Sequence, residues 1–499
     1  MHHCASEPKL VGGGVADAGV GASNQSCAKQ GRQANVLAYA SISCPRPPVT
    51  MCLCHEALLG SPQRLRYVAM DSTVKYLLSL GAIRDRAKVV GQAAKDGNLT
   101  HFDVHEDKLE DVADFVTSVI KRDYGPDKFD TIPPHGRWQH FEVGDKPRIA
   151  DLLTKWKADG CDDQELTRRL IDLFFVSVLL DAGAGDYWKY VEPGTKQSYE
   201  RSEGIAVASL YMFLEGGYTV EKNNTPLVDG KGLAQLTTEA LAEGLQVTES
   251  NPMLGVDSRA NLLRGLGRSL LAHPEIFGEA GRPGNAVDYL LKSATNSSTL
   301  DILTFWDLLQ TLLIPIWPQD RTTINGLPIG DAWPLGALAK QAGSSYNDKS
   351  VPEFIQPFHK LTQWLTYSLM VPFQRILGIE WINAESLTAL PEYRNGGLFV
   401  DMGVLSLKKA TLEAGLKASG ESLPSFAAGD DVIVEWRAMT LVLIDKLYPM
   451  ILSRMDGAQL SMAQLLEAGT WKSGRETAAK LRPNTKSSPI IIQSDGTVF

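Results

Sequence analysis

Apolar residues recur at helical spacing through most of residues 70–499, and this pattern predicts a mainly α-helical fold. The clearest segment opens with Asp162 and Glu165, which match a capping box at the start of a helix. Apolar residues then follow at helical spacing: Leu166, Leu170, Leu173 and Phe174. The same spacing predicts further helices over residues 104–122, 201–215, 235–245, 257–272, 285–294, 300–313, 357–377, 435–453 and 460–480.

Strand signals are short and few. Runs of β-branched residues occur at 432–434 and 490–492, and each predicts one short strand. No internal repeat and no long low-complexity linker interrupts the helical segments. We therefore expect residues 70–499 to form a single large helical domain, which could divide into two lobes.

Residues 1–69 follow a different pattern. They show no helical or strand period and mix Gly, Ala, Ser and Pro, which predicts a disordered N-terminal extension. The extension is either a mitochondrial presequence or the result of a wrongly assigned start codon. In the second case Met70 opens the protein, and Asp71 is among the residues that could cap a helix near Val74.

Composition narrows the function classes. The chain has 44% hydrophobic and 21% charged residues, as ordinary globular proteins do. Its net charge of −9 speaks against a nucleic-acid partner, and no apolar run reaches the roughly 18 residues of a membrane span. Five of the six cysteines precede residue 70, so the body of the protein is expected to be reduced and cytoplasmic. A zinc site at Cys44, Cys52, Cys54 and His55 is disfavoured by its spacing.

Polar and aromatic residues are dense in five segments: 135–142, 180–190, 357–368, 390–401 and 434–440. In the first, His135, His140 and Glu142 could bind a metal, although an ordered loop anchored by its arginine is the favoured interpretation. In the second, Asp181 follows an apolar helix, where the helix dipole disfavours a carboxylate. A partner cation or a hydrogen bond to the next turn would explain its position.

The segment 357–368 predicts a helix with an apolar core face and an adjoining polar face, which is either plain surface or, as its aromatic residues favour, partly buried. Pro357 suits the first turn, and Pro372 is expected to kink or end the helix. One face carries an apolar stripe made of Phe358, Leu361, Leu365 and Leu369. The adjoining face carries Lys360, Gln363, Trp364 and Tyr367. Aromatic residues on a polar face indicate the wall of a pocket.

These segments carry a resemblance to a known family. From about Leu77 to Phe499 the chain resembles the uracil catabolism protein 4 family of fungi and bacteria. The strings that carry the resemblance are 135–142, 180–190, 201–209, 325–333, 358–368, 390–399 and 494–499. The resemblance implies a role in a uracil breakdown route that passes through ribosylurea species.

A second similarity covers roughly the C-terminal third. The ordered strings 358–363, 392–394 and 434–437 are similar to the queuosine-salvage glycosidases, helical proteins related to DNA glycosylases that cut a ribosyl N-glycosidic bond. Glu392 stands where those enzymes have an aspartate, and Asn395 begins a segment that departs from their base-recognition string. The similarity implies a DNA-glycosylase-like helical fold and hydrolysis of an N-ribosyl bond, without the same base specificity.

The hypothesis for this chain is hydrolysis of a ring-opened uridine derivative such as ribosylurea or its 5′-phosphate. Glu392 is expected to stabilise charge at the sugar and accept a proton from water, and Lys360 is the second catalytic candidate. Lys360 or Arg394 would keep Glu392 ionised by lowering its pKa, or either could hold a 5′-phosphate or the leaving urea oxygen. Substrate contacts are expected from Tyr393, Arg394, Asn395, Gln363, Trp364, Tyr367, Asp181, Trp188, Asp401, Glu435 and Arg437. No metal and no cofactor is expected, and the oligomeric state is left open.

Two alternatives stay open at this point. One is an amidohydrolase that attacks the urea carbonyl with a metal or with a cysteine, for which Cys161 would be the candidate. The other is a non-catalytic scaffold or regulator of the pathway. Detection of a metal would favour the first, whereas binding to another protein without any product would favour the second.

Overall fold

Asp71 opens the part of the chain that the structure, a computed structural model, describes. The described residues are 71–181, 187–221, 225–294, 298–318 and 321–493. The predicted extension 1–69 lies outside them, as do residues 182–186 and the terminal string 494–499. Ser72 and Thr73 begin the first helix, and the carboxylate of Asp71 caps it by accepting the N–H of Thr73 at 2.9 Å.

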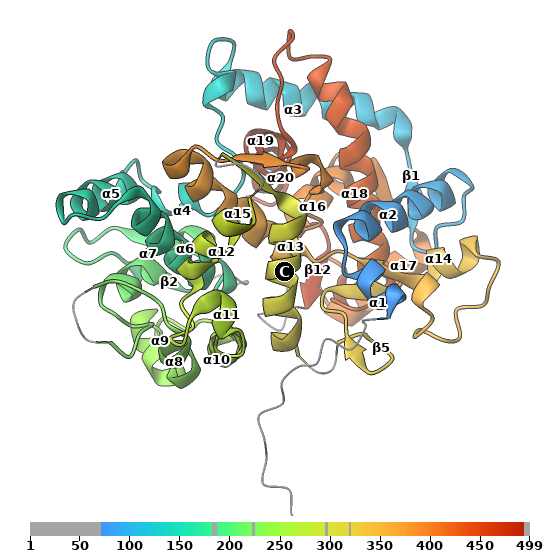
Figure 1. The fold of residues 1–499 in the computed structure, drawn as a ribbon. Helices are drawn as coiled ribbons and strands as arrows, with labels where there is room; N and C mark the ends of the chain where they lie inside the picture. The colour runs from blue at the N-terminus through green and yellow to red at the C-terminus, as the bar shows by residue number, and fades with distance from the viewer. Residues whose placement is uncertain (1–70, 182–186, 222–224, 295–297, 319–320, 494–499) are drawn as a thin grey trace, which may run out of the picture. The chain divides into compact units, whose positions relative to one another are not determined.

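Helices dominate the described residues, which form one mainly α-helical domain (Figure 1). They are α1 Ser72–Leu77, α2 Leu80–Lys95, α3 Leu109–Tyr124, α4 Trp138–Phe141, α5 Arg148–Ala158, α6 Asp163–Leu179, α7 Arg201–Leu214, α8 Gly230–Gln235, α9 Thr238–Gly244, α10 Val256–Leu271, α11 Pro274–Phe277, α12 Ala286–Ser293, α13 Ile302–Leu313, α14 Gly336–Gln341, α15 Lys360–Leu377, α16 Tyr393–Asp401, α17 Lys409–Ser419, α18 Asp431–Leu452, α19 Met462–Leu465 and α20 Trp471–Leu481. A π-helical turn, Leu466–Thr470, joins the last two. The division into two lobes and the likeness to DNA glycosylases stay predictions.

Strands occur as short pairs that tie distant segments together. The antiparallel pairs are β1 Phe102–Val104 with β10 Leu405–Leu407, β2 Lys189–Val191 with β3 Ser198–Glu200, β5 Thr323–Ile324 with β6 Leu327–Pro328, and β7 Ala332–Pro334 with β8 Ile355–Pro357. The parallel pairs are β4 Thr299–Asp301 with β9 Glu380–Ile382, and β11 Ser425–Ala427 with β12 Ile491–Gln493. The strand predicted at 490–492 is therefore confirmed as β12.

The strand predicted at 432–434 is wrong, because these residues form the first turn of α18. Val432, Ile433 and Val434 are all buried. Burial of every side chain of the turn in the helical core outweighs the modest strand preference of β-branched residues. At these residues tertiary packing therefore determines the secondary structure, against the local strand propensity.

Helix α15 lies between two groups of helices in Figure 1, with α4–α11 on one side and α1, α2, α14 and α17 on the other. Its residues from Leu361 to Phe373 are all buried, which confirms that both of its predicted faces are covered by protein. Pro372 does not end the helix, which continues to Leu377. A proline removes one backbone hydrogen bond, and the burial of its neighbours offsets that loss.

The start of α15 differs from the prediction. Pro357 belongs to β8, not to the first turn, and His359 adopts a left-handed conformation with φ of 46° directly before the helix. The imidazole Nε2 of His359 is 2.8 Å from the carbonyl oxygen of Leu77. This contact with the end of α1 holds the turn that sets the direction of Lys360.

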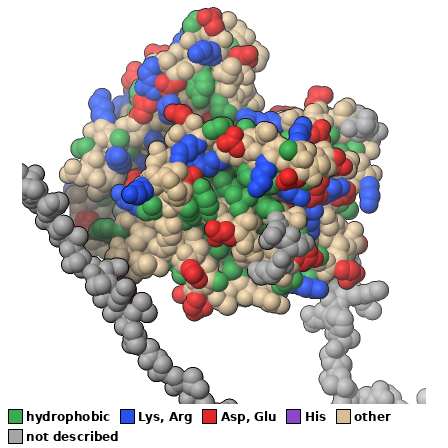
Figure 2. Space-filling view, turned by 90° about the vertical axis from the view of Figure 1, so that its left-hand side faces the viewer, with side chains coloured by type: hydrophobic (Ala, Val, Ile, Leu, Met, Phe, Trp, Pro, Cys, Tyr) green, Lys and Arg blue, Asp and Glu red, His purple; other side chains and the backbone are tan. Residues whose placement is uncertain are grey.

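One face of the molecule is drawn in Figure 2, on the side where α5 and α9 lie in Figure 1. Apolar side chains gather at its centre and side chains of both charges surround them. Of all large apolar side chains in the described residues, Tyr187 and Leu254 are the most exposed, at 81% and 67%. In the part of the chain that the structure describes, no helix combines the length and apolar character needed to cross a membrane.

Candidate active site

The starts of α15 and α16 and the end of α6 meet at one place. Lys360 is the first residue of α15, Glu392 directly precedes α16, and Asp181 follows α6. Burial lowers the pKa of Lys360, and the nearby carboxylates of Glu392 and Asp181 oppose that shift. The two residues predicted as catalytic therefore lie near one another, and we refer to Lys360, Glu392, Tyr393, Asp181 and Trp364 as the Lys360 cluster.

Asp331 sets the beginning of α15. Its carboxylate accepts the backbone N–H of Lys360 at 3.0 Å, and its carbonyl oxygen accepts the N–H groups of Phe358 and His359. Arg437 donates from both terminal nitrogens to the two carboxylate oxygens at 2.8 Å, and the pair is buried. Burial alone would raise the pKa of Asp331, but Arg437 outweighs it and holds the pKa far below the ordinary value.

Arg437 is held by this ion pair, and the expected contact with substrate stays a prediction. Its Nε also donates to the carbonyl oxygen of Pro391 at 3.2 Å. Arg437 therefore links α18 to the start of α15 and to the residue before Glu392. Sequence reasoning gave Asp331 no role, because only the family resemblance marked its string.

Glu392 caps α16. Its two carboxylate oxygens accept the backbone N–H groups of Arg394 and Asn395, each at 2.6 Å. Burial raises the pKa of Glu392, whereas these N–H donors and Lys360 oppose the rise. The expectation that a neighbouring cation would leave this carboxyl with a lowered pKa is therefore wrong, because desolvation exceeds the attraction.

Gln363 and Tyr367 hold the segment that leads to Glu392. The amide of Gln363 accepts the backbone N–H of Thr388 and donates to the Thr388 hydroxyl, both at 2.8 Å. The hydroxyl of Tyr367 donates to the Thr388 carbonyl at 2.9 Å. Gln363 and Tyr367 therefore position the segment before Glu392, and a substrate contact by either of them stays a prediction.

Replacing Gln363 with Met tests this positioning role. The variant leaves the buried N–H of Thr388 without an acceptor, which should lower the free energy of unfolding by about 1–3 kcal/mol. Urea unfolding followed by circular dichroism measures the change. Gln459 is a matched control, because its amide donates only a long, exposed hydrogen bond to the Gly457 carbonyl. A Gln363→Met variant as stable as Gln459→Met would contradict the assignment.

Asp181 has the partner cation that its position required. Arg137 donates to its carboxylate at 2.8 Å, and the arginine is fully buried. The same guanidinium donates to the hydroxyl and the carbonyl oxygen of Ser177, and it lies 5.4 Å from the centre of the Trp364 ring. The prediction of a loop anchored by its arginine is confirmed, and the loop fixes Asp181 beside Trp364.

Three donors in the Lys360 cluster have no hydrogen-bond partner among the residues that the structure describes. They are the ammonium of Lys360, the hydroxyl of Tyr393 and the indole N–H of Trp364, and none of them is fully enclosed. The structure thus places polar donors, the amino group of Lys360 among them, near the carboxyl groups of Glu392 and Asp181. Such an arrangement suits a small polar ligand that supplies the missing acceptors.

The side chains of the remaining predicted contacts bind protein groups, and a substrate contact by any of them stays a prediction. Arg394 donates to the carbonyl of Lys486, Asp401 pairs with Arg482, Trp188 donates to the carbonyl of Leu245, and Glu435 accepts the N–H groups of residues 100–102. Asn395 donates to the carbonyl of Leu390 at 3.0 Å and shapes the turn before α16.

The two histidines of segment 135–142 have separate partners. The Nδ1 of His135 lies 2.6 Å from the carboxylate of Glu467, whereas the Nδ1 of His140 lies 3.3 Å from a nitrogen of Arg137. Across the described ranges, no three His, Cys, Asp or Glu side chains are grouped as metal ligands would be.

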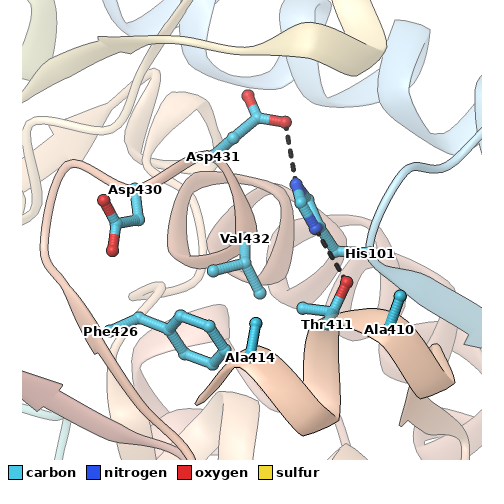
Figure 3. Close-up of a pocket in the computed structure, with 8 residues that line it drawn as sticks. All are labelled: His101, Ala410, Thr411, Ala414, Phe426, Asp430, Asp431 and Val432. Carbon is cyan, nitrogen blue, oxygen red and sulfur yellow. Dashed lines mark hydrogen bonds and ion pairs between the residues drawn. The ribbon is translucent and has the colours of Figure 1, made fainter. Parts of the chain in front are cut away.

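A separate surface pocket of about 340 Å³ lies beside α17 and the start of α18 (Figure 3). His101 stands between Asp431 and Thr411, with a ring nitrogen 3.1 Å from an oxygen of each. Phe426, Ala414 and Val432 form an apolar wall. Sequence reasoning missed this pocket, because nothing near His101 marks it.

His101 therefore has both ring nitrogens engaged, unlike the donors of the Lys360 cluster. A carboxylate can only accept here, so the nitrogen facing Asp431 carries the proton and the other accepts from the Thr411 hydroxyl. This order of groups can activate a hydroxyl. The Lys360 cluster remains the stronger candidate, since it alone combines unpartnered donors with two carboxylates and the predicted catalytic residues.

The amino-acid sequence is similar to one protein family and to two fungal proteins. Residues 76–499 match the model of a family described as "Protein of unknown function (DUF1688)". The chain is 50% identical over 430 residues to Protein urg3 of Schizosaccharomyces pombe, covering 86% of this chain and 99% of that protein. It is 43% identical over 447 residues to Uracil catabolism protein 4 of Lachancea kluyveri, covering 87% of this chain and 100% of that protein.

Proposed function

We propose, from the premise that the chain belongs to the DUF1688 family, that it acts in uracil catabolism as an N-ribosyl hydrolase. The name of the Lachancea kluyveri relative supports the pathway. The proposed substrate is a ring-opened uridine derivative, ribosylurea or its 5′-phosphate. The observation that carries the proposal is the meeting of Lys360, Glu392 and Asp181, with unpartnered donors beside them.

In the proposed reaction water attacks the anomeric carbon, the carbon–nitrogen bond breaks, and the products are ribose and urea. The Glu392 carboxylate accepts the proton from water. The Asp181 carboxylate, paired with Arg137, stabilises positive charge on the sugar. A ureido nitrogen leaves readily only when it gains a proton, and the ammonium of Lys360 is the proposed donor. Solvent then returns the proton from Glu392 to Lys360.

Incubation of the purified full chain with ribosylurea, its 5′-phosphate and UMP tests the proposal. We expect ribose or ribose 5-phosphate together with an equal amount of urea from one of the first two compounds. The absence of a reducing sugar product from all three would contradict the proposal and favour a scaffold or regulator.

The pH dependence of kcat/KM is expected to be bell-shaped. Activity needs Glu392 ionised, so it should rise with pH through a pKa that burial raises above 4.5. Activity also needs Lys360 protonated, so it should fall through a pKa that burial lowers below 10.5. Because an arginine side chain does not lose its proton in this range, Lys360→Arg should remove the alkaline limb from whatever activity it retains. An unchanged alkaline limb would contradict the role of Lys360.

Hydrolysis at the urea carbonyl is the second candidate. Cys161 lies before α6, and Asp181 lies after that helix of 17 residues, which spans about 25 Å. Cys161 is therefore far from the Lys360 cluster, whereas Thr411 beside His101 offers a hydroxyl nucleophile. This reaction would release ammonia in place of urea. Ammonia release that disappears in Thr411→Val would favour this candidate, while urea release unchanged in that variant would favour the glycosidase.

A further inference from the structure

The tautomer of His140 is fixed by its neighbour. The ring nitrogen Nδ1 lies 3.3 Å from a terminal nitrogen of Arg137, and a guanidinium can only donate. Nδ1 must therefore be the acceptor, so the proton of the neutral ring sits on Nε2. Because Arg137 is itself held by Ser177 and Asp181, the direction of the imidazole is fixed together with that of Asp181.

The Nε2–H of His140 has no partner among the described residues, although the side chain is only 7% exposed. The rings of Trp364 and Trp471 flank it, with centroids 6.1 and 6.3 Å away. Burial and the charge of Arg137 lower the pKa of His140, which keeps the ring neutral. The Nε2 atom is not fully enclosed, so a bound ligand can supply the acceptor that this N–H lacks.

Glu203 supplies the complementary acceptor. It lies in the first turn of α7 and pairs with Arg475 at 3.0 Å. Burial alone would raise the pKa of Glu203, but attraction to His140 and to Arg475, together with the hydrogen bond from Arg475, holds it below the ordinary value. It influences the titration of His140, yet no direct hydrogen bond or ion pair joins the two side chains. The Trp471 ring lies 6.3 Å from the ring of His140 and 4.7 Å from the guanidinium of Arg475, which holds Glu203, so the donor and the acceptor adjoin the same tryptophan without contacting each other.

This pair adjoins the Lys360 cluster. Trp364 follows Lys360 by one turn of α15, about 6 Å along the helix, and its ring contacts both Arg137 and His140. Asp181 accepts a hydrogen bond from Arg137 at 2.8 Å and lies near enough to Lys360 to oppose the lowering of its pKa. A ligand whose sugar occupies the Lys360 cluster can thus extend a second polar group towards His140 and Glu203.

We propose that His140 and Glu203 recognise the terminal ureido group of the substrate, a specificity that rests on the proposed function. The Nε2–H of His140 donates to the carbonyl oxygen, and the Glu203 carboxylate accepts from the terminal NH2. A carbonyl next to an NH2 is the arrangement that satisfies one fixed donor and one fixed acceptor together. Arg137 acts here as a positioning residue, because it sets the tautomer and orientation of His140.

Binding measured apart from catalysis tests this proposal. Isothermal titration with ribosylurea, with every protein carrying Glu392→Gln so that the ligand is not consumed, should give an affinity about 10- to 100-fold weaker when His140→Phe is added, since this change keeps a ring between the tryptophans but loses the donor. His140→Gln retains a donor near the same place and should recover part of the affinity. A ligand with both terminal N–H groups methylated should bind more weakly than ribosylurea when Glu203 is present, but no more weakly than ribosylurea in Glu203→Met, which has no side-chain oxygen to accept the hydrogen bond.

His135 provides the matched control. The same Trp471 ring contacts it, but its Nδ1 is already bound to Glu467, so His135→Phe should leave ureide affinity unchanged once melting confirms a folded protein. Equal affinity with and without His140→Phe would overturn the proposal, as would the absence of ribosylurea binding when His140 is intact. Binding that follows the predicted pattern without any release of ribose by the wild type would support the recognition pair and contradict the hydrolase instead.

Discussion

Replacement of Glu392 with Gln is expected to lower kcat for ribose release by about two to four orders of magnitude, the range typical of an acid–base group. The amide has nearly the same shape but cannot accept a proton from water. It retains one oxygen that can still accept a backbone N–H at the start of α16. The free energy of unfolding should therefore fall by only about 0.5–2 kcal/mol, as it does for other substitutions at a helix N-cap. Steady-state kinetics with urea detection measures the effect.

Asp162→Asn separates the chemistry of Glu392 from its capping role. Asp162 caps α6 and accepts the backbone N–H of Glu165 at 2.7 Å, so this variant alters a carboxylate cap away from the cluster. We expect a comparable change in melting temperature and an unchanged kcat. If Glu392→Gln turns over substrate as fast as Asp162→Asn does, the catalytic role of Glu392 is excluded.

Replacement of Asp331 with Asn is expected to give the largest loss of stability, about 3–5 kcal/mol, because it leaves the buried Arg437 without its anionic partner. The measurement is urea unfolding of the purified chain. The exposed pair of Asp456 with Lys121 is a matched control, and Asp456→Asn should cost less than about 1 kcal/mol.

The double variant Asp331→Asn with Arg437→Met guards against a simple failure to fold. It removes both charges, so it should be more stable than Asp331→Asn alone if the cost arises from the uncompensated guanidinium. A double variant less stable than the single one would contradict that cause. It would indicate that Arg437 matters through its hydrogen bond to Pro391 and its packing on Phe358.

Most of the helices could be predicted from the sequence because their apolar spacing is local information. The helix predicted at 201–215 is α7, Arg201–Leu214, and the one at 257–272 is α10, Val256–Leu271. The predictions that failed concern segments whose secondary structure depends on residues far away in the sequence. The turn 432–434 is helical because its surroundings bury it, and Pro357 joins β8 because β7 pairs with it.

The sequence predicted which segments form the candidate site, but it did not predict the role of each residue in them. Dense polar and aromatic strings marked the segments around Lys360 and Glu392, and the structure brings these segments together. Whether a polar side chain is free depends on partners far along the chain, such as Thr388 for Gln363 and Asp331 for Arg437. No spacing within a string reveals such partners, so Gln363 and Trp364 looked equivalent although only Trp364 keeps an unpartnered donor.

The cap at the start of α16 has a consequence for turnover. The oxygens of Glu392 that would receive a proton from water are the same atoms that fasten two backbone amides. A protonated carboxyl group is a weaker hydrogen-bond acceptor than a carboxylate. Each catalytic cycle would therefore briefly weaken the two hydrogen bonds that cap the start of α16. Under the proposed mechanism, protonation of Glu392 is therefore coupled to a small loosening of the start of α16, and this loosening would help the sugar product to leave.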